Sequence, residues 1–255
     1  MTMAFDHMVL LVHDLKGAVK DFQSLGFTVL ERADTSHGST IFRFVSFADG
    51  SYILLTAFTS RAGADAHRLG PVLASGEGWA DYSFLVPDAA VVGERLKAAA
   101  MPVKGPVEVS NVLAGGERWS LDLLMTGRGA GGDVALPFLV SDNEGRRHRI
   151  PGPSRHANGA KGISGVRLSS SDPQTVVATL KVIGVTARAA EGPATRIGFG
   201  DVWVDVLALA DAPQGREGGG IVEVVLACDA EGMPGEGRQL NPALSHGAPI
   251  LLQGV

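Results

Sequence analysis

The chain has 255 residues, of which 45% are hydrophobic and 19% are charged, a composition typical of a folded globular protein and not of a disordered one. Its net charge of −5 provides no strong basic field, so we expect neither a nucleic acid nor a membrane surface as partner. The single cysteine, Cys228, excludes an internal disulfide framework, and without a signal-like N-terminus the expectation is a reduced, cytoplasmic protein.

The first predicted unit begins with an apolar strand over residues 7–12. Asp14 then caps a helix over residues 15–25, and Gly26 ends that helix. Alternating hydrophobicity and the Asp49-Gly50 hairpin signal predict three further strands, over residues 27–32, 40–47 and 51–57. The order is therefore strand, helix and three strands.

The same order follows a connecting helix that we predict over residues 64–73. A strand over residues 81–86 precedes the second cap, Asp88, and a helix over residues 89–100. Three strands complete this unit, over residues 103–109, 118–125 and 135–140. The glycine-rich loop before the last of them lacks the GxGxxG order, so we predict a strand connection there and not a nucleotide-binding loop.

A polar linker, which contains the one basic run of the chain at residues 146–149, precedes the third unit. We predict this run to be a solvated loop. In the third unit a strand over residues 166–169 is followed by the cap Asp172, a helix with Pro173 at its first position, and Gly184 at its end. Short strands are predicted over residues 185–189, 195–199, 202–209 and 221–227.

The three capping aspartates align the units, because they lie 74 and 84 residues apart and each follows a strand and begins a helix. This repeat divides the chain into residues 1–60 as a first βαβββ module, 61–145 as a connecting helix with a second module, 146–162 as a linker, 163–228 as a third module, and 229–255 as a Gly/Pro-rich tail.

Short motifs add a resemblance to a known family: Asp6-His7 heads the first strand, and further matches are Val12-His13-Asp14-Leu15, Leu25-Gly26-Phe27, Asp49-Gly50-Ser51-Tyr52, Leu136-Pro137-Phe138 and His156-Ala157-Asn158-Gly159-Ala160. Through them the sequence resembles glyoxalase-like domain proteins of the vicinal oxygen chelate superfamily. The resemblance implies an α+β fold in which repeated βαβββ modules form a half-open, glyoxalase-like β-barrel with flanking helices. It also implies a small organic ligand and, in metal-dependent members, a divalent metal (Zn, Fe, Mn or Ni) that acts as a Lewis acid.

Three residues are candidates for such a metal site. His7 stands where the first ligand of the family stands, and Asp81 holds the same position in the second module. Glu223 lies in the last strand of the third unit, at the place that Leu54 has in the first. Asp81 and Glu223 are each candidates for a weaker metal ligand or for a general base. Because a catalytic metal needs about three protein ligands, His7, Asp81 and Glu223 suffice only if the third unit closes over the same cavity. The alternative is that all three are structural: His7 is then a strand-end histidine bonded to a neighbour.

Four further residues are candidates for the wall of a ligand pocket. Arg43 and Arg167 lie within predicted strands and could anchor a carbonyl or carboxylate, although either side chain could instead point outward. Trp79 and Trp119 could face the ligand or simply pack the barrel.

Three roles remain open at this point. The first is a metal-dependent enzyme of the lyase, isomerase or dioxygenase type, which His7 favours. The second is a non-catalytic protein that sequesters or senses a small apolar or aromatic molecule without a metal, which the absence of acids in residues 52–56 favours. A third role is assembly, in which the additional module forms the interface of a homodimer.

Overall fold

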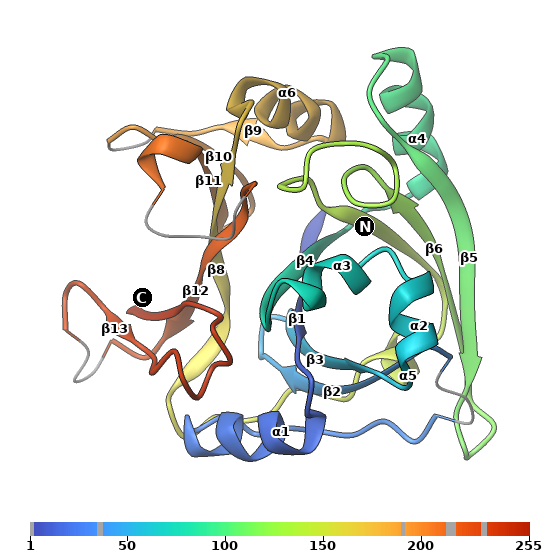
Figure 1. Cartoon of the computed structure of the whole chain (residues 1–255), viewed down its shortest axis with the longest axis vertical. Coiled ribbons are helices and arrows are strands. Elements are labelled where there is room, and N and C mark those ends of the chain that lie inside the picture. The colour runs from blue at the N-terminus through green and yellow to red at the C-terminus, as the bar shows by residue number, and fades with distance from the viewer. Residues whose placement is uncertain (1–2, 35–37, 190–191, 213–217, 231–233) are drawn as a thin grey trace.

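The computed structural model describes residues 3–34, 38–189, 192–212, 218–230 and 234–255. Two seven-stranded sheets stand side by side, and helices α4 (Ala89–Ala98) and α6 (Pro173–Ile183) adjoin at one end of the molecule (Figure 1). The prediction of an α+β fold with a curled, half-open barrel is confirmed.

The first sheet has the order β2-β3-β1-β4-β7-β6-β5. Its two central strands, β1 and β4, are antiparallel, and each has a parallel neighbour on its other side, β3 for β1 and β7 for β4. In chain order the strands are β1 (Ala4–Leu11), β2 (Thr40–Ser46), β3 (Tyr52–Phe58), β4 (Gly78–Leu85), β5 (Lys104–Val112), β6 (Arg118–Met125) and β7 (Phe138–Glu144).

The second sheet repeats this arrangement in the order β13-β14-β12-β8-β11-β10-β9. Here β8 and β12 form the antiparallel centre, with β11 parallel to β8 and β14 parallel to β12. The strands are β8 (Ala160–Ser170), β9 (Thr186–Ala187), β10 (Thr195–Phe199), β11 (Val202–Ala208), β12 (Gly220–Cys228), β13 (Arg238–Gln239) and β14 (Ile250–Gly254), with a 3₁₀ turn η1 at Leu209–Asp211. Residues 229–255, expected only as a tail, thus supply β13 and β14.

The three capping aspartates form the bonds that the sequence predicts. The side chains of Asp14, Asp88 and Asp172 accept backbone N–H groups at 3.0, 3.0 and 3.1 Å, at the start of α1 (Leu15–Ser24), α4 and α6 respectively. Each bond satisfies one of the N–H groups that a helix start otherwise leaves without a partner.

The predicted connecting helix and one predicted strand differ in the structure. The helix over residues 64–73 is two short helices, α2 (Arg61–Ala66) and α3 (Gly70–Ala74). The backbone is extended at His67, and Pro71, which has no N–H to donate, lies in the first turn of the second helix. The strand over residues 27–32 is reduced to a single bridge between Leu30 and Phe44.

Beyond that bridge, the segment before β2 is bonded to the hairpin at the opposite edge of the curled first sheet. The backbone N–H of Ala114, in the β5–β6 hairpin, donates to the carbonyl of Ala33 at 2.8 Å, and Asp34 bridges Leu113. Helices α2 and α3 lie in front of the concave face (Figure 1). Within the described ranges, no helix is both long enough and apolar enough to cross a membrane.

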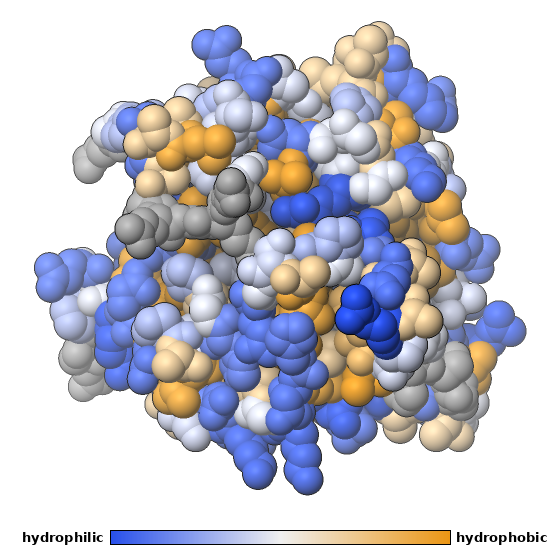
Figure 2. All heavy atoms as spheres, in the orientation of Figure 1, coloured by the Kyte–Doolittle hydropathy of each residue, from blue (hydrophilic) through white to orange (hydrophobic). Residues whose placement is uncertain are grey.

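Alternation along β1 divides its side chains between two apolar clusters. Met8 and Leu10 point toward the interface between the sheets, where they join the larger cluster, whereas Val9 and Leu11 point into the curl of the first sheet. On the face in Figure 2, hydrophilic residues predominate and apolar ones form small separate areas. The apolar residues on the concave side of the first sheet form a buried cluster of their own.

Hydrogen bonds along the seam fix the second sheet against the first. Asp49 Oδ2 accepts the backbone N–H of Ile163 at 3.2 Å, and the indole N–H of Trp79 donates to the carbonyl of Pro249 at 3.0 Å. At the other end the hydroxyl of Ser170 donates to Asp133 at 2.6 Å.

Candidate ligand-binding site

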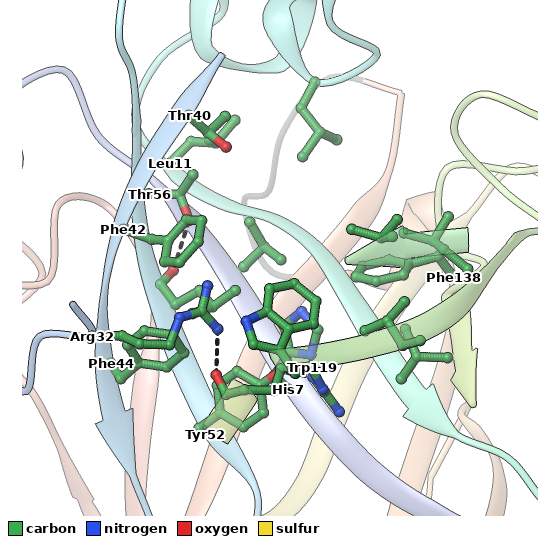
Figure 3. A pocket seen from close by; sticks show the side chains of 18 of the residues that line it. His7, Leu11, Arg32, Thr40, Phe42, Phe44, Tyr52, Thr56, Trp119 and Phe138 are labelled. Carbon is green, nitrogen blue, oxygen red and sulfur yellow. Dashed lines mark hydrogen bonds between the residues drawn. The ribbon is translucent and has the colours of Figure 1, made fainter. Parts of the chain in front are cut away.

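A cavity of about 240 Å³ lies in the curl of the first sheet. Its walls come from β1, β2, β3, β5, β6 and β7, and most of its lining is apolar or aromatic, as Figure 3 shows. Alternation explains the lining, because every second residue of a strand faces the concave side. The contributions include His7 and Val9 from β1, Phe42 and Phe44 from β2, and Tyr52 and Leu54 from β3.

One end of the cavity is closed by a network of buried charges. Asp6 is fully buried, and its two carboxylate oxygens accept hydrogen bonds from Arg146 at 2.7 Å, from Arg149 at 3.2 and 3.3 Å, and from the hydroxyl of Tyr52 at 3.1 Å. Asp142 accepts bonds from Arg149 Nε and from Arg146, both at 2.8 Å. Two carboxylates therefore face two guanidinium groups, and the charges balance.

Helix α5 (Arg146–Arg149) supplies both cations of this network. Burial alone would raise the pKa of Asp6, but Arg149, the hydrogen bond from His7 and Arg146 together hold that pKa well below its ordinary value. Asp6 is consequently a carboxylate at neutral pH in the folded protein.

His7 forms the junction between this network and the cavity. Its Nδ1 lies 2.8 Å from Asp6 Oδ2, and its ring stacks on Tyr52 with centroids 4.6 Å apart and meets the edge of Phe138 at 5.2 Å. Burial lowers the pKa of His7, although the bond to Asp6 opposes this shift. A neutral ring next to a carboxylate carries its proton on Nδ1, so Nε2 keeps its lone pair.

A third cation, Arg32, lies at the cavity wall among aromatic rings. Its guanidinium carbon is 5.1 Å from the ring centre of Phe42, 5.2 Å from that of Phe44 and 4.8 Å from that of Trp119. Asp34 neutralises it through two bonds, of 2.6 and 2.8 Å. Arg32 also donates to the carbonyl of Arg149 and thereby joins the wall to the charged network.

The structure brings only part of the predicted site together. His7 and Trp119 line the cavity. Asp81 lies on the same face of the sheet as His7, because it pairs with Val9 across β1 and β4, but its carboxylate is bound by Arg68. Burial raises the pKa of Asp81, and Arg68 opposes that shift.

The other predicted residues lie elsewhere. Arg43 bonds to Glu31 at 2.7 Å with its side chain partly exposed, and Trp79 contributes to the seam between the sheets.

Glu223 and Arg167 face each other in the second sheet, where they form an ion pair. Arg167 also lies 4.0 Å from Asp205, which takes two bonds of 2.7 Å from Arg196. The face of the second sheet that these residues share is thus filled with paired charges.

The donor set around His7 does not fit a divalent metal. Such a centre needs about three protein ligands. Among the described residues no group of three His, Cys, Asp or Glu side chains stands close enough to hold an ion. Asp6 already receives four hydrogen bonds from cations and Tyr52, and Leu54 offers no ligand.

Sequence reasoning missed the cationic half of the network. The basic run at residues 146–149 is a turn of helix, not a solvated loop, and Arg149 in it is 4% exposed. The spacing of Arg146 and Arg149 would have been informative, because residues three apart share one face of a helix. Asp6, the acid beside His7, heads a buried strand, so its carboxylate needs a cation from elsewhere in the chain as partner.

Comparisons with known proteins bear on this site. A family model described as a glyoxalase-like domain matches residues 5–184, the region that contains the cavity. A comparison with curated proteins gave no match.

Three solved structures have a similar fold at low sequence identity. One is a hypothetical protein from Staphylococcus aureus, 14% identical, with a TM-score of 0.73 over 99% of this chain and 100% of that one. Another is a mutant of 4-hydroxymandelate synthase from Streptomyces coelicolor, 13% identical, with a TM-score of 0.61 over 90% and 72%. A xylose isomerase-like TIM barrel/4-hydroxyphenylpyruvate dioxygenase fusion protein is 14% identical, with a TM-score of 0.56 over 90% and 37%.

Proposed function

The chain belongs to the glyoxalase-like domain family of the vicinal oxygen chelate superfamily, and on that premise we propose that it binds a small, largely apolar organic molecule in the cavity of its first sheet without a metal ion. The observation that carries the proposal is the lining of that cavity. Aromatic and aliphatic side chains from six strands surround it, and the charged groups at its edge are paired with one another.

The size of the cavity supports a ligand of one substituted ring or two fused rings. An apolar cavity of about 150 Å³ accommodates benzene, and the cavity here measures about 240 Å³. Transfer of such a ligand from water gains roughly 25 cal/mol for each Å² of apolar surface buried. A charged ligand would lose its hydration without meeting an uncompensated opposite charge.

A second candidate function rests on the pair of Asp6 and His7. A histidine held by a carboxylate at Nδ1, with Nε2 toward a cavity, is the arrangement that a metal-independent proton-transfer enzyme would use. Both candidates require the same cavity to take up a ligand, so binding is tested first.

Naphthalene is a suitable probe for the cavity, because it is apolar and has two fused rings. We expect it to raise the thermal midpoint of unfolding, since a ligand present at 100-fold its dissociation constant stabilises the native state by about 2.7 kcal/mol. Calorimetric titration should give the same affinity with and without EDTA, because no metal takes part.

Two tryptophan variants on one strand provide a test and its matched control. Val109 in β5 lines the cavity, whereas the neighbouring Glu108 points to the opposite face. We expect Val109→Trp to weaken naphthalene binding at least about tenfold by occupying the cavity, and Glu108→Trp to leave it unchanged. Equal binding in both variants, or no binding by the wild-type protein, would contradict the proposal.

A further inference from the structure

His7 gives the cavity a hydrogen-bond acceptor that the protein itself does not use. Nδ1 bonds to Asp6, and Nε2 has no hydrogen-bond partner among the described residues. We propose that Nε2 accepts a hydrogen bond from the ligand, so that the cavity selects uncharged ring compounds with an O–H or N–H group, such as phenols. This inference rests on the proposed function and specifies its ligand class.

The surroundings of His7 fix both the proton position and the ring orientation. Asp6 can only accept, because it is held ionised between Arg146 and Arg149, so the bond to it requires the proton on Nδ1. The ring is held between Tyr52, which stacks on it at an interplanar angle of 14°, and Phe138, which meets it at 73°. The lone pair of Nε2 therefore has a fixed direction before any ligand arrives.

Most other polar groups of the lining have partners, and His67 cannot offer an acceptor, because its Nδ1 accepts the backbone N–H of Leu69 at 3.2 Å and its proton is then on Nε2. The hydroxyl of Tyr52 donates to Asp6 and accepts from Arg149 at 2.6 Å, and Arg32 is bound by Asp34. The indole N–H of Trp119 has no partner among the described residues, but that atom is buried. Among the ring nitrogens of the described lining, Nε2 of His7 is thus the acceptor left for a ligand with a donor.

The same geometry disfavours anions. A carboxylate or phenolate at this position would place its oxygen against the lone pair of Nε2, and two acceptors cannot bond to each other. The arginines nearby cannot compensate, because Asp6, Asp142 and Asp34 already neutralise them. The cavity should therefore rank its ligands by donor and charge, in addition to size.

Four probes of one ring system test this ranking by calorimetric titration: naphthalene, 2-naphthol, 2-methoxynaphthalene and 2-naphthoate. We expect 2-naphthol to bind roughly tenfold more tightly than naphthalene or 2-methoxynaphthalene, which is the value of about one hydrogen bond to a buried acceptor. We expect 2-naphthoate to bind more weakly than all three.

His7→Phe should abolish the preference for 2-naphthol while naphthalene still binds, because the variant keeps an aromatic ring and loses the acceptor. His148→Phe, in α5 and away from the cavity lining, should keep the preference.

A spectroscopic measurement makes the test independent of whether the variant folds. In wild-type protein with ¹⁵N-labelled histidine, Nε2 of His7 should have the chemical shift of an unprotonated ring nitrogen. Its resonance should move upfield on addition of 2-naphthol, but not of 2-methoxynaphthalene.

The outcomes separate the two proposals. Equal affinity for 2-naphthol, naphthalene and 2-methoxynaphthalene would overturn the role of His7 and leave the proposed function in place. Tightest binding of 2-naphthoate would also overturn it. Failure of all four probes to bind would instead overturn the proposed function on which the inference rests.

Discussion

Arg149 is the residue on which the closed end of the cavity depends. Its guanidinium bonds to Asp6, to Asp142 and to the hydroxyl of Tyr52, and it is almost completely buried. The ring of Tyr52 in turn stacks on the ring of His7. A change at Arg149 therefore affects charge balance and the orientation of the candidate ligand-binding group together.

We expect Arg149→Met to destabilise the protein by about 3–5 kcal/mol, because it leaves two buried carboxylates with only Arg146 as cation. Urea unfolding measures the difference. Arg147→Met is the matched control, since the adjacent side chain is exposed, and it should change the free energy of unfolding by no more than about 0.5 kcal/mol. Similar losses in both variants would mean that the buried network does not contribute to stability.

At this scale the sequence predicted the position of His7 and, as one of two alternatives, its bond to a neighbouring residue, but not the residues that surround it. A histidine at the head of an apolar strand indicated a site, and the structure places it at the cavity. Its partners Arg149 and Tyr52 are far from it in the chain, and only the folded sheets bring them together. Asp81 and Glu223 were expected beside it, but the carboxylate of each is bound by an arginine.

The helix ends are the elements in which local sequence and structure agree best. Capping bonds at Asp14, Asp88 and Asp172 involve residues two or three positions away, so local sequence is sufficient to predict them. In contrast, β14 forms because Ile250 and Leu252 are buried beside β12, and no local pattern in a Gly/Pro-rich segment reveals that pairing. The bridge at Leu30 likewise depends on β2, which comes later in the chain.

Gly26, after α1, is required for two reasons that a matched pair of variants can separate. Its φ of +88° disfavours any L side chain, and an added Cβ would lie 2.9 Å from the backbone nitrogen of Asn158. Gly50 has a φ of +86° with open space around it. We expect Gly50→Ala to cost about 1–2 kcal/mol from conformation alone and Gly26→Ala to cost clearly more. Equal losses in thermal or urea unfolding would show that the linker yields without cost.

Across the whole molecule, the linker that leads into the second sheet is bonded to the first module through His156. Its Nδ1 accepts the backbone N–H of Thr28 at 3.0 Å, and its Nε2 lies 3.2 Å from the carbonyl oxygen of Ser46. Both bonds require the neutral ring, protonated on Nε2. Burial lowers the pKa of His156 from 6.5, so the unfolded chain binds the proton more readily than the folded one.

The sign of the pH effect follows from that difference. Stability contributed by His156 is complete above pH 6.5 and is lost as the pH falls from there toward the lower folded pKa. We expect the free energy of unfolding of His156→Gln to fall less than that of the wild type between about pH 7.5 and about pH 5.5. Parallel pH profiles for the two proteins would contradict this assignment.

The paired charges on the second sheet have a consequence for how this protein can change over evolutionary time. Arg167 lies between Glu223 and Asp205, and Arg196 shares Asp205 with it. Loss of Arg167 alone leaves Glu223 without its arginine, whereas joint replacement of Arg167 and Glu223 by apolar residues does not. Substitutions on this face should therefore become fixed as compensating pairs, while single apolar exchanges remain tolerable around the cavity of the first sheet.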